Sequence, residues 1–334
     1  MRNALYFLYY LKNTSKNKLK KFLNKAIEDT QKSKAVVLKD IVFASFKHKT
    51  SILDYFYFRF YNKNEDERSN WAGTGFMYEY QLKMNPKNKR NILEDKKIFL
   101  NTYSDYVKRS WCVVDKFDEE KKKVLSILHN ISGKIVVKNS KGQVGREVKV
   151  LAASDFTFDS LKSYMLGNNF DLLEESVIQH SELMKLSPSG LNTVRIITQL
   201  NDKHEVVILG ARLRVSVNSS VDNLGAGNFA VAIDEKNGVV TSNGIYSDIT
   251  KKNVFFHPVT KVKLKGFQIP HWRLAIDTVK EAAIKFPQNK SIGWDVAITD
   301  NQIDLIEGNH NWCKLLYQLP VNRGLKKELL KYYK

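Results

Sequence analysis

Two carboxylates and one amide, Asp295, Glu307 and Asn309, stand in the segment 293–312, GWDVAITDNQIDLIEGNHNW. Oxygen ligands of this kind suit Mg²⁺, which keeps part of its water shell and takes further oxygens from substrate phosphates. The spacing alone is explained equally well by an ordinary hairpin whose acidic side chains are solvated. Residues elsewhere in the chain must decide between these two interpretations.

The same segment predicts the element that would bring these side chains together. Apolar and polar residues alternate on both sides of a polar turn, which is typical of a β-hairpin. We expect a three-residue loop with Asn301 or Gln302 near the left-handed region, because this loop pairs Asp295 directly with Glu307. The amide side chain, two residues further along the strand, then points to the same face.

Residues suited to phosphate binding occur in the segment 133–150, GKIVVKNSKGQVGREVKV. A short apolar strand, residues 135–137, leads into Lys138 and then into a loop with Gly142 and Gly145. Glycines let a backbone approach phosphate oxygens closely, and a lysine anchored at a strand end supplies a fixed positive charge. The Walker pattern is absent, and glycine-containing hairpins with solvated lysines are common. The loop therefore indicates phosphate binding only in combination with other motifs.

Three arginines lie inside strand patterns. The segments 192–200 and 205–217 predict a hairpin, with Arg195, Arg212 and Arg214 on or near it. A strand in a packed sheet offers few solvated positions, and the guanidinium group matches phosphate and carboxylate in geometry. We therefore expect these arginines to bind an anion.

The elements between these motifs alternate between helix and strand. Residues 170–177 predict a strand that ends on Glu174 and Glu175. Such a strand end, with its exposed backbone, suits an adenine edge and a ribose, but an ordinary acidic strand terminus explains it equally well. Residues 273–286 predict an amphipathic helix that leads directly into the acidic hairpin.

A further helix is predicted over residues 91–111, because its apolar side chains recur near one helical face. Asp95 is suited to begin it, since an aspartate accepts hydrogen bonds from the first backbone amides of a helix. Lys96 or Lys97 would then lie in the first turn.

Composition limits the class of protein. The formal net charge of +19 on 334 residues attracts nucleic acid, anionic lipid or acidic substrates without distinguishing them. Cys112 and Cys313 are too few and too far apart for a disulfide framework or a zinc site, so we expect two buried thiols in a reducing cytoplasm. No apolar run reaches the roughly 18 residues of a membrane span, and we expect neither export nor a transmembrane helix.

The amino-terminal part of the chain has two features. Residues 1–34 join an apolar start to a lysine-dense continuation, at a spacing that predicts helices with a basic face. Such a helix packs its apolar face on the protein, which is the commoner case, or lies on an anionic membrane. The aromatic run at residues 55–61 is typical of a core, although aromatics beside an arginine also stack bases. No nucleic-acid motif accompanies it, so we do not expect nucleic-acid binding.

Several long motifs, in order and in register, resemble the sugar-transfer-associated ATP-grasp family of polysaccharide biosynthesis, over roughly residues 90–313. They are SPSGLNTVRIIT (187–198), VDNLGAGNFAVAID (221–234), HPVTKVKLKGFQIPHW (257–272) and GWDVAITDNQIDLIEGN (293–309). One departure is Ala226, which stands where a second consecutive glycine is expected. The resemblance implies an α+β ATP-grasp fold, in which two α+β subdomains clasp ATP after a basic, partly helical amino-terminal region.

The resemblance also implies roles for individual residues, with ATP and Mg²⁺ as cofactors. Residues similar to the nucleotide-binding positions of the family are Lys96, Lys138, Gly142, Gly145, Glu174, Glu175 and Val177. Asp295, Glu307 and Asn309 are similar to its Mg²⁺ ligands. Arg195 and Arg212 are similar to the arginines that meet the transferred phosphate or the acyl phosphate.

These resemblances lead to an expected activity, a carboxylate–amine ligase that uses ATP in cell-surface polysaccharide biosynthesis. Its partners would be small carboxylate and amine substrates and a sugar or glycan intermediate, in the cytoplasm or at the inner membrane face. The alternative is a basic membrane- or nucleic-acid-associated protein with a vestigial nucleotide site. We expect three regions: 1–90 as the basic amino-terminal region, 91–182 as the small nucleotide-clasping subdomain, and 183–334 as the carboxyl-terminal subdomain with the Mg²⁺ site.

Overall fold

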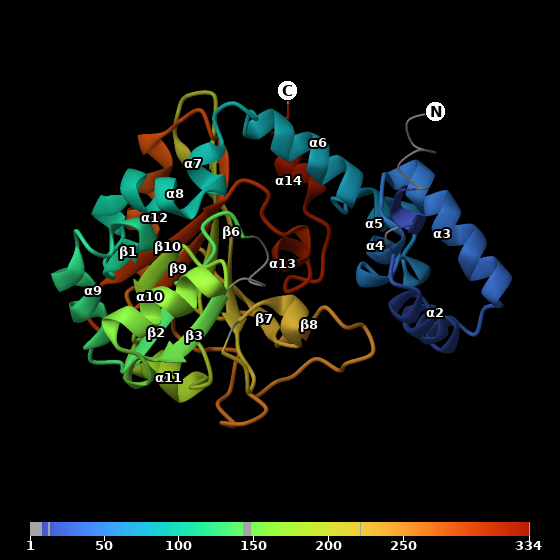
Figure 1. Ribbon diagram of the computed structural model, residues 1–334. Coiled ribbons are helices and arrows are strands. Elements are labelled where there is room, and N and C mark those ends of the chain that lie inside the picture. Colours follow the sequence, from blue (N-terminus) through green and yellow to red (C-terminus); the bar gives the residue numbers. More distant parts are fainter. Residues whose placement is uncertain (1–8, 13, 143–147, 221, 334) are drawn as a thin grey trace.

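The structure is a computed structural model that describes residues 9–12, 14–142, 148–220 and 222–333. A helical amino-terminal group stands beside a larger body of helices and two sheets (Figure 1). One glycine of the predicted phosphate loop, Gly145, lies outside the described residues. None of the described helices combines the length and the apolar composition that a membrane span requires.

The amino-terminal group includes, from residue 14 onward, the helices α2 (Lys16–Thr30), α3 (Lys34–His48), α4 (Ile52–Tyr57) and α5 (Glu65–Ser69). Serine or asparagine side chains accept backbone hydrogen bonds at the start of each one, which explains where they begin. The aromatic run at residues 55–61 supplies much of their shared core, together with Phe22 from α2. The prediction that this run is core is therefore confirmed, and α2 packs its apolar face on the protein.

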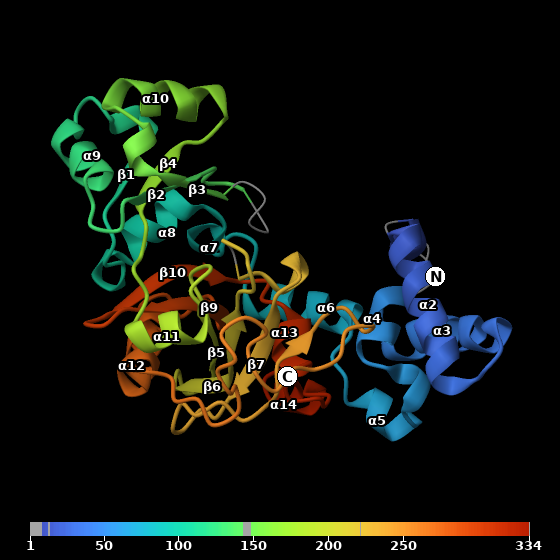
Figure 2. The ribbon, with the colours of Figure 1, turned by 90° about the horizontal axis from the view of Figure 1, so that it is seen from below.

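The smaller sheet has the order β1-β4-β2-β3, and all of its pairs are antiparallel. Its strands are β1 (Trp111–Val113), β2 (Lys134–Lys138), β3 (Val148–Ala152) and β4 (Leu172–Glu175). Two helices, α9 (Lys121–Leu128) and α10 (Phe158–Gly167), pack on it around a core of their own. Figure 2 shows this sheet and its helices as a layer separate from the larger sheet.

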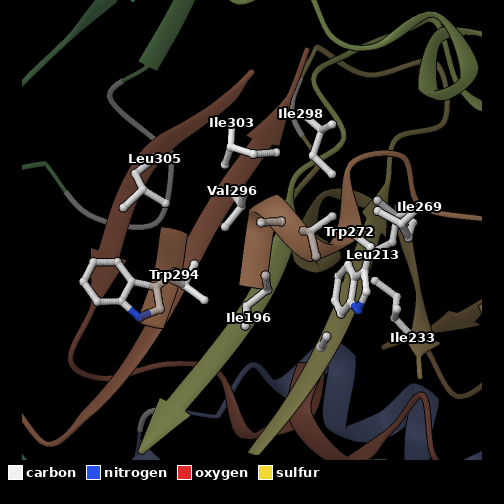
Figure 3. Packing of buried hydrophobic residues seen from close by; sticks show 14 of the residues in the cluster. Ile196, Leu213, Ile233, Ile269, Trp272, Trp294, Val296, Ile298, Ile303 and Leu305 are labelled. Atoms are coloured by element: carbon white, nitrogen blue, oxygen red, sulfur yellow. The ribbon is translucent and has the colours of Figure 1, made fainter. Parts of the chain in front are cut away.

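The larger sheet is antiparallel, with the order β10-β9-β5-β6-β7-β8. Its strands are β5 (Val194–Leu200), β6 (Val206–Val215), β7 (Phe229–Ile233), β8 (Ile245–Tyr246), β9 (Ser291–Ile298) and β10 (Ile303–Asn309). Helix α12 (Trp272–Lys285) covers one face, and the apolar side chains of the sheet and the helix form the main core. Figure 3 shows this packing, in which Trp272 of the helix and Leu213 of β6 belong to the same core.

The remaining helices connect these parts and close the body. They are α6 (Thr74–Met84), α7 (Asn91–Glu94), α8 (Lys96–Thr102), α11 (Ser181–Leu186), α13 (Lys314–Gln318) and α14 (Lys326–Leu330). Short 3₁₀ turns occur at Phe60–Asn62, Ser104–Tyr106, Val114–Lys116, Ala153–Asp155 and Leu224–Ala226. Two antiparallel sheets with helices on them form a mixed α+β fold, as expected from the sequence.

The acidic hairpin forms as predicted, but its loop does not. The N–H of Thr299 donates to the carbonyl of Gln302 at 3.0 Å, so the loop has two residues rather than three. Neither Asn301 nor Gln302 has a positive φ. The expected pairing of Asp295 with Glu307 still occurs, because a bulge between Leu305 and Glu307 shifts the register by one residue.

Two other expectations need correction. The predicted helix start at Asp95 is confirmed, because its side chain accepts from the amides of Lys97 and Ile98 and α8 begins at Lys96. The helix ends at Thr102, however, and does not continue to residue 111, since a 3₁₀ turn and strand β1 follow it. The cysteines are both free, but only Cys112 is buried, and Cys313 is exposed at the start of α13. Burial raises the pKa of the Cys112 thiol to about 11, which makes this group unreactive at neutral pH.

Candidate active site

Antiparallel pairing brings the three predicted metal ligands to one face of the larger sheet. Asp295 on β9 stands directly opposite Glu307 on β10, and Asn309 follows two residues later on the same strand. The amide of Asn309 donates to the carboxylate of Glu307 at 3.1 Å. The two carboxylates and the amide expected from the sequence therefore converge.

Two arginines hold Asp295 in place from the neighbouring strands. Arg195 on β5 pairs with Asp295 across the sheet and donates to its Oδ1 through Nε. Arg214 on β6 donates to the other oxygen, Oδ2, at 2.7 Å. Burial by itself would raise the pKa of Asp295, but the charges of the two arginines outweigh burial and lower the pKa to about 2. Asp295 is therefore a fixed negative charge at neutral pH.

Glu307 has a different environment, because it has no ion pair with a basic side chain in the described part of the chain. Its burial, and next the negative charge of Asp295, raise the pKa of Glu307 above the usual range. A divalent cation beside the two carboxylates would remove this repulsion, and carboxylate and amide oxygens are ligands that Mg²⁺ accepts. The residues present thus fit a Mg²⁺ ion held by Asp295, Glu307 and Asn309.

We also searched the described residues for other groups of side chains that could bind a metal ion. Within the described ranges there is no group of three or more His, Cys, Asp or Glu side chains that could hold a metal. The set above contains only two carboxylates, and its third member is an amide. Metal binding there depends on further oxygens, and substrate phosphates supply such oxygens to Mg²⁺ in many sites.

The structure does not bring Arg212 into this cluster. Arg212 stands opposite Arg195 in the sheet, but its guanidinium turns toward α13 and donates to the carbonyl of Tyr317 at 2.7 Å. A further nitrogen donates to the carbonyl of Ala211 at 2.6 Å. Burial lowers the pKa of Arg212, although Glu235 opposes this effect. The phosphate role of Arg212 stays a prediction, and in this geometry Arg214, rather than Arg212, contacts Asp295.

Arg214 belongs to a buried network that includes Thr193 and Asp222. Arg214 lies 3.3 Å from the carboxylate of Asp222, and the hydroxyl and the amide of Thr193 both donate to that carboxylate at 2.7 Å. The hydroxyl of Thr193 also accepts from Arg214. The sequence indicated only that Arg214 lies near an anion, because nothing in its spacing identified Thr193 and Asp222 as its supports.

The second predicted lysine, Lys138, lies at the end of β2 and is paired with an acidic residue. Its Nζ donates to the carboxylate of Glu174 at 2.6 Å, and Arg109 donates to the same carboxylate oxygen at 2.7 Å. Burial would raise the pKa of Glu174, but Arg109 and Lys138 together lower it to about 2. One carboxylate therefore holds two cations in a buried position, and this fixes the direction of Lys138.

The first predicted lysine, Lys96, begins α8 beside the phosphate loop. Its Nζ donates to the carbonyl of Gly142 at 2.5 Å, and its backbone N–H donates to the carbonyl of Ser140 at 3.0 Å. The next residue, Lys97, forms an ion pair with Asp171 at 2.7 Å. These contacts join the start of α8 to the described part of the loop, and the nucleotide roles of Lys96 and Gly142 stay predictions.

The remaining predicted nucleotide residues lie at the end of β4. Glu175 is half-buried, its backbone N–H donates to the carbonyl of Ser110 at 2.8 Å, and its carboxylate accepts from the amide of Ser110 at 3.3 Å. Val177 follows the strand and is half-buried. The nucleotide roles of both residues stay predictions.

Arg109 links the two halves of the site, and the sequence did not single it out. Besides Glu174 on β4, it contacts β10: it donates to Asp304 at 2.7 Å, to the carbonyl of Leu305 at 3.0 Å and to the carbonyl of Ile306 at 3.2 Å. The last carbonyl belongs to the bulge that aligns Glu307 with Asp295. Strands β4 and β10 therefore share one buried guanidinium.

A comparison with protein families gives one match to this chain. The model of a family described as sugar-transfer associated ATP-grasp matches residues 76–334. No curated protein sequence matches the chain. The amino-terminal helices α2 to α5 lie before the matched region.

Comparison with solved structures gives partial similarities. An ADP complex of N5-carboxyaminoimidazole ribonucleotide synthetase has 12% identity and a TM-score of 0.38, over 66% of this chain and 45% of its own. D-alanine–D-alanine ligase from Bacillus anthracis has 12% identity and a TM-score of 0.42, over 73% and 68%. Biotin carboxylase from Campylobacter jejuni has 13% identity and a TM-score of 0.45, over 78% and 53%. The chain spans less than two thirds of the first and the third of these proteins.

Proposed function

This chain belongs to the sugar-transfer associated ATP-grasp family, and on that premise we propose that it is a ligase that uses Mg²⁺ and ATP to join a carboxylate to an amine. The proposed product is an amide between an amino acid and a sugar in cell-surface polysaccharide biosynthesis. The observation that carries the proposal is the convergence of Asp295, Glu307 and Asn309 beside Arg195 and Arg214.

The proposed chemistry has two steps. A carboxylate oxygen of one substrate attacks the terminal phosphorus of ATP, which forms an acyl phosphate and releases ADP. The amine of the second substrate then attacks the acyl carbon, phosphate leaves, and the amine loses a proton. Phosphoryl transfer of this kind depends on positioning and on charge neutralisation, so it needs no serine or cysteine nucleophile.

The side chains of this protein would divide these tasks. Asp295, Glu307 and Asn309 would hold Mg²⁺, which neutralises phosphate charge and orients the phosphates when bound. Lys138, directed by Glu174, would bind phosphate oxygens from the smaller sheet. Arg195 contacts Asp295 and would meet the transferred phosphate, and Arg214, which contacts the same carboxylate, would assist it.

A turnover measurement with one variant tests this proposal. We expect ADP release from ATP that depends on both an amino acid and a uronic acid, measured over a panel of each. Glu307→Gln should lower this rate by about 10²-fold or more, because it removes a charged Mg²⁺ ligand, while the circular dichroism spectrum stays unchanged. The matched control is Glu119→Gln, which removes an exposed carboxylate far from the cluster in the sequence.

Two results would contradict the proposal. The metal assignment is wrong if Glu307→Gln keeps the rate of the unchanged protein. Mg²⁺–ATP binding without turnover on any pair of substrates, together with salt-sensitive binding to anionic vesicles or nucleic acid, would favour the alternative of a basic binding protein with a vestigial nucleotide site.

A further inference from the structure

A cavity of about 170 Å³ lies between the amino-terminal helices and the larger sheet. One wall is helix α2, with Lys18, Lys21 and Phe22, and the other is formed by residues 224–228 and by the segment 246–251 after β7. In Figures 1 and 2 the chain after β8 extends toward the amino-terminal helices. Because the family match begins at residue 76, this cavity combines a wall inside the matched region with one outside it.

An ion pair and a shared apolar core connect the two walls of the cavity. Lys21 of α2 forms an ion pair with Asp248 at 2.6 Å. Behind this pair, Ile249 packs into the same core as Phe22 and the aromatic run of the amino-terminal helices. The hydroxyl of Ser247 donates to the carbonyl of Leu224 at 3.3 Å, which ties the glycine-containing loop to the same wall.

Among the described residues, the lining of the cavity carries more positive than negative charge. Three lysines and one aspartate line it, and only Lys21 is paired with that aspartate. Within the described residues, neither Lys18 nor Lys251 has an ion pair with a carboxylate: the Nζ of Lys18 lies 5.2 Å from the ring centre of Tyr57, and that of Lys251 lies 4.5 Å from the ring centre of Tyr246. The Nζ of Lys251 also donates to the carbonyl of Gly227 at 3.4 Å. A ligand with a negative charge would give both lysines an anionic partner.

The walls also offer the contacts that a sugar ring uses. The aromatic side chains of Phe22 and Tyr246 present apolar surface. The neighbouring polar groups include the hydroxyl of Ser247, which can still accept a hydrogen bond, and the carbonyl of Gly227, which accepts from the Nζ of Lys251 at 3.4 Å. Gly227 has a φ of +90°, which favours glycine, and Gly225 faces open space, so the loop brings backbone rather than side chains to the cavity. The volume suits a single sugar with its acidic group.

The same loop leads directly to the catalytic cluster. Asp222 and Asn223 precede the residues of the cavity wall, and both contact Arg214, at 3.3 Å and 3.4 Å. Arg214 in turn contacts the carboxylate of Asp295 at 2.7 Å. A ligand in the cavity would therefore lie against a loop whose other end supports the metal cluster.

We propose that this cavity is the binding site for an anionic saccharide, with Lys18 and Lys251 as the residues that recognise its negative charge. This inference rests on the proposed ligase function, because it names the class of one of the two substrates. The charge can be a carboxylate, as in a uronic acid, or a phosphate, as in a sugar phosphate. The experiment below distinguishes these two sources.

Direct binding measurements test the inference without any need for turnover. The probes are galacturonic acid, galactose 1-phosphate and galactose, which share one ring and differ in charge, followed by ligand-observed NMR titration. We expect an anionic probe to bind about tenfold more tightly than galactose, since a charged partner strengthens each hydrogen bond that it accepts. The anion that binds more tightly identifies the source of the charge.

A pair of double variants shows whether the cavity is responsible. Lys18→Ala with Lys251→Ala should weaken the binding of the anion about tenfold, to the level of galactose. The control, Lys20→Ala with Lys252→Ala, removes the same net charge from exposed positions of the same two segments and should leave the affinity unchanged. Equal losses in both double variants, equal binding of galactose and the anions, or no binding of either anion would each overturn the inference.

Two parallel measurements separate this inference from its premise. Vesicles that contain phosphatidylglycerol test the alternative of a membrane surface: if they bind through Lys18 and Lys251 while neither anion binds, the cavity is not a saccharide site. Mg²⁺–ATP binding is measured on the same samples. Normal Mg²⁺–ATP binding without anion binding refutes the cavity alone, whereas anion binding without Mg²⁺–ATP binding refutes the ligase function alone.

Discussion

The buried carboxylates of the candidate site differ in the number of positively charged side chains beside them. Glu174 and Asp295 each face two cations, and the pKa of each is lowered to about 2, although burial acts in the opposite direction. Glu307 lies close to Asp295 and forms no ion pair within the described residues, and its burial and then the charge of Asp295 raise its pKa, against the opposing charge of Arg195. The first two carboxylates are thus fixed anions, whereas Glu307 is suited to exchange a proton for a metal ion.

The lowered pKa of Glu174 predicts a loss of stability in acid. A carboxyl whose pKa falls from 4.5 to about 2 on folding stabilises the protein fully above pH 4.5. This contribution is lost as the pH falls from about 4.5 toward about 2, because the unfolded state binds the proton first. Glu174→Gln should be less stable than the unchanged protein at pH 7, and the difference in the free energy of unfolding should shrink below pH 4.5. Urea unfolding at several pH values measures this difference.

The control for this prediction is Glu175→Gln, one residue further along the strand. Glu175 accepts a backbone hydrogen bond from Ser110 and has no ion pair in the part of the chain that the structure describes. At pH 7, Glu175→Gln should lower the free energy of unfolding by less than Glu174→Gln does. A cost for Glu174→Gln that stays constant from pH 7 to pH 3.5 would show that Arg109 and Lys138 do not hold this carboxylate as an anion.

At the scale of elements, the site depends on how β4, β10 and the segment before β1 meet. Arg109 contacts Glu174 on β4 and three oxygens on β10, two of which are backbone carbonyls. Its burial would lower its pKa, but Glu174 and Asp304 outweigh this effect, so the group is a permanent cation. Arg109 therefore joins the smaller sheet, at β4, to the larger sheet, at β10.

Replacement of Arg109 by a neutral residue should lower the free energy of unfolding substantially. Arg109→Met leaves two buried carboxylates, on Glu174 and Asp304, without their shared partner, and breaking a buried pair in this way costs about 3–5 kcal/mol. Arg273→Met is the control, since the side chain of Arg273 is 95% exposed, and it should change the free energy of unfolding by less than about 0.5 kcal/mol. Denaturant unfolding of both variants provides the test. Equal losses in the free energy of unfolding would show that Arg109 does not stabilise the contact between the two sheets.

At the scale of the whole molecule, the amino-terminal helices are not an independent appendage. Their core includes Ile249, which follows β8, and Leu319, which follows α13. Both residues lie within the family match, whereas the helices α2 to α5 precede it. The two parts of the chain thus share a buried interface, and the saccharide cavity lies at its edge.

This shared core predicts that a substitution inside the matched region weakens the helices before it. Ile249 is 5% exposed, and Ile249→Ala should lower the free energy of unfolding by about 2–5 kcal/mol. Amide hydrogen exchange should show the largest loss of protection in α2 and α4. Ile131→Ala, at a residue that is 97% exposed, is the control and should leave the protection unchanged. A loss of protection confined to the larger sheet would mean that the helices hold together without Ile249.

The sequence by itself determined the parts of the site that depend on local order. Strand alternation was enough to predict the acidic hairpin, and a strand period of two was enough to place Glu307 and Asn309 on one face. Aromatic and apolar residues at residues 55–61 and 273–286 were enough to predict a core run and helix α12, because burial follows side-chain chemistry directly.

Only the tertiary structure decided which charges meet. Arg212 and Arg214 are equivalent in the strand pattern, but the approach of α13 gives the guanidinium of Arg212 a carbonyl partner, and Thr193 and Asp222 direct Arg214 to Asp295. The positions of Arg109 and of the cavity beside α2 depend in the same way on contacts between segments far apart in the chain. Sequence periodicity sets the face on which a side chain lies, but the partners it finds there depend on how distant elements pack.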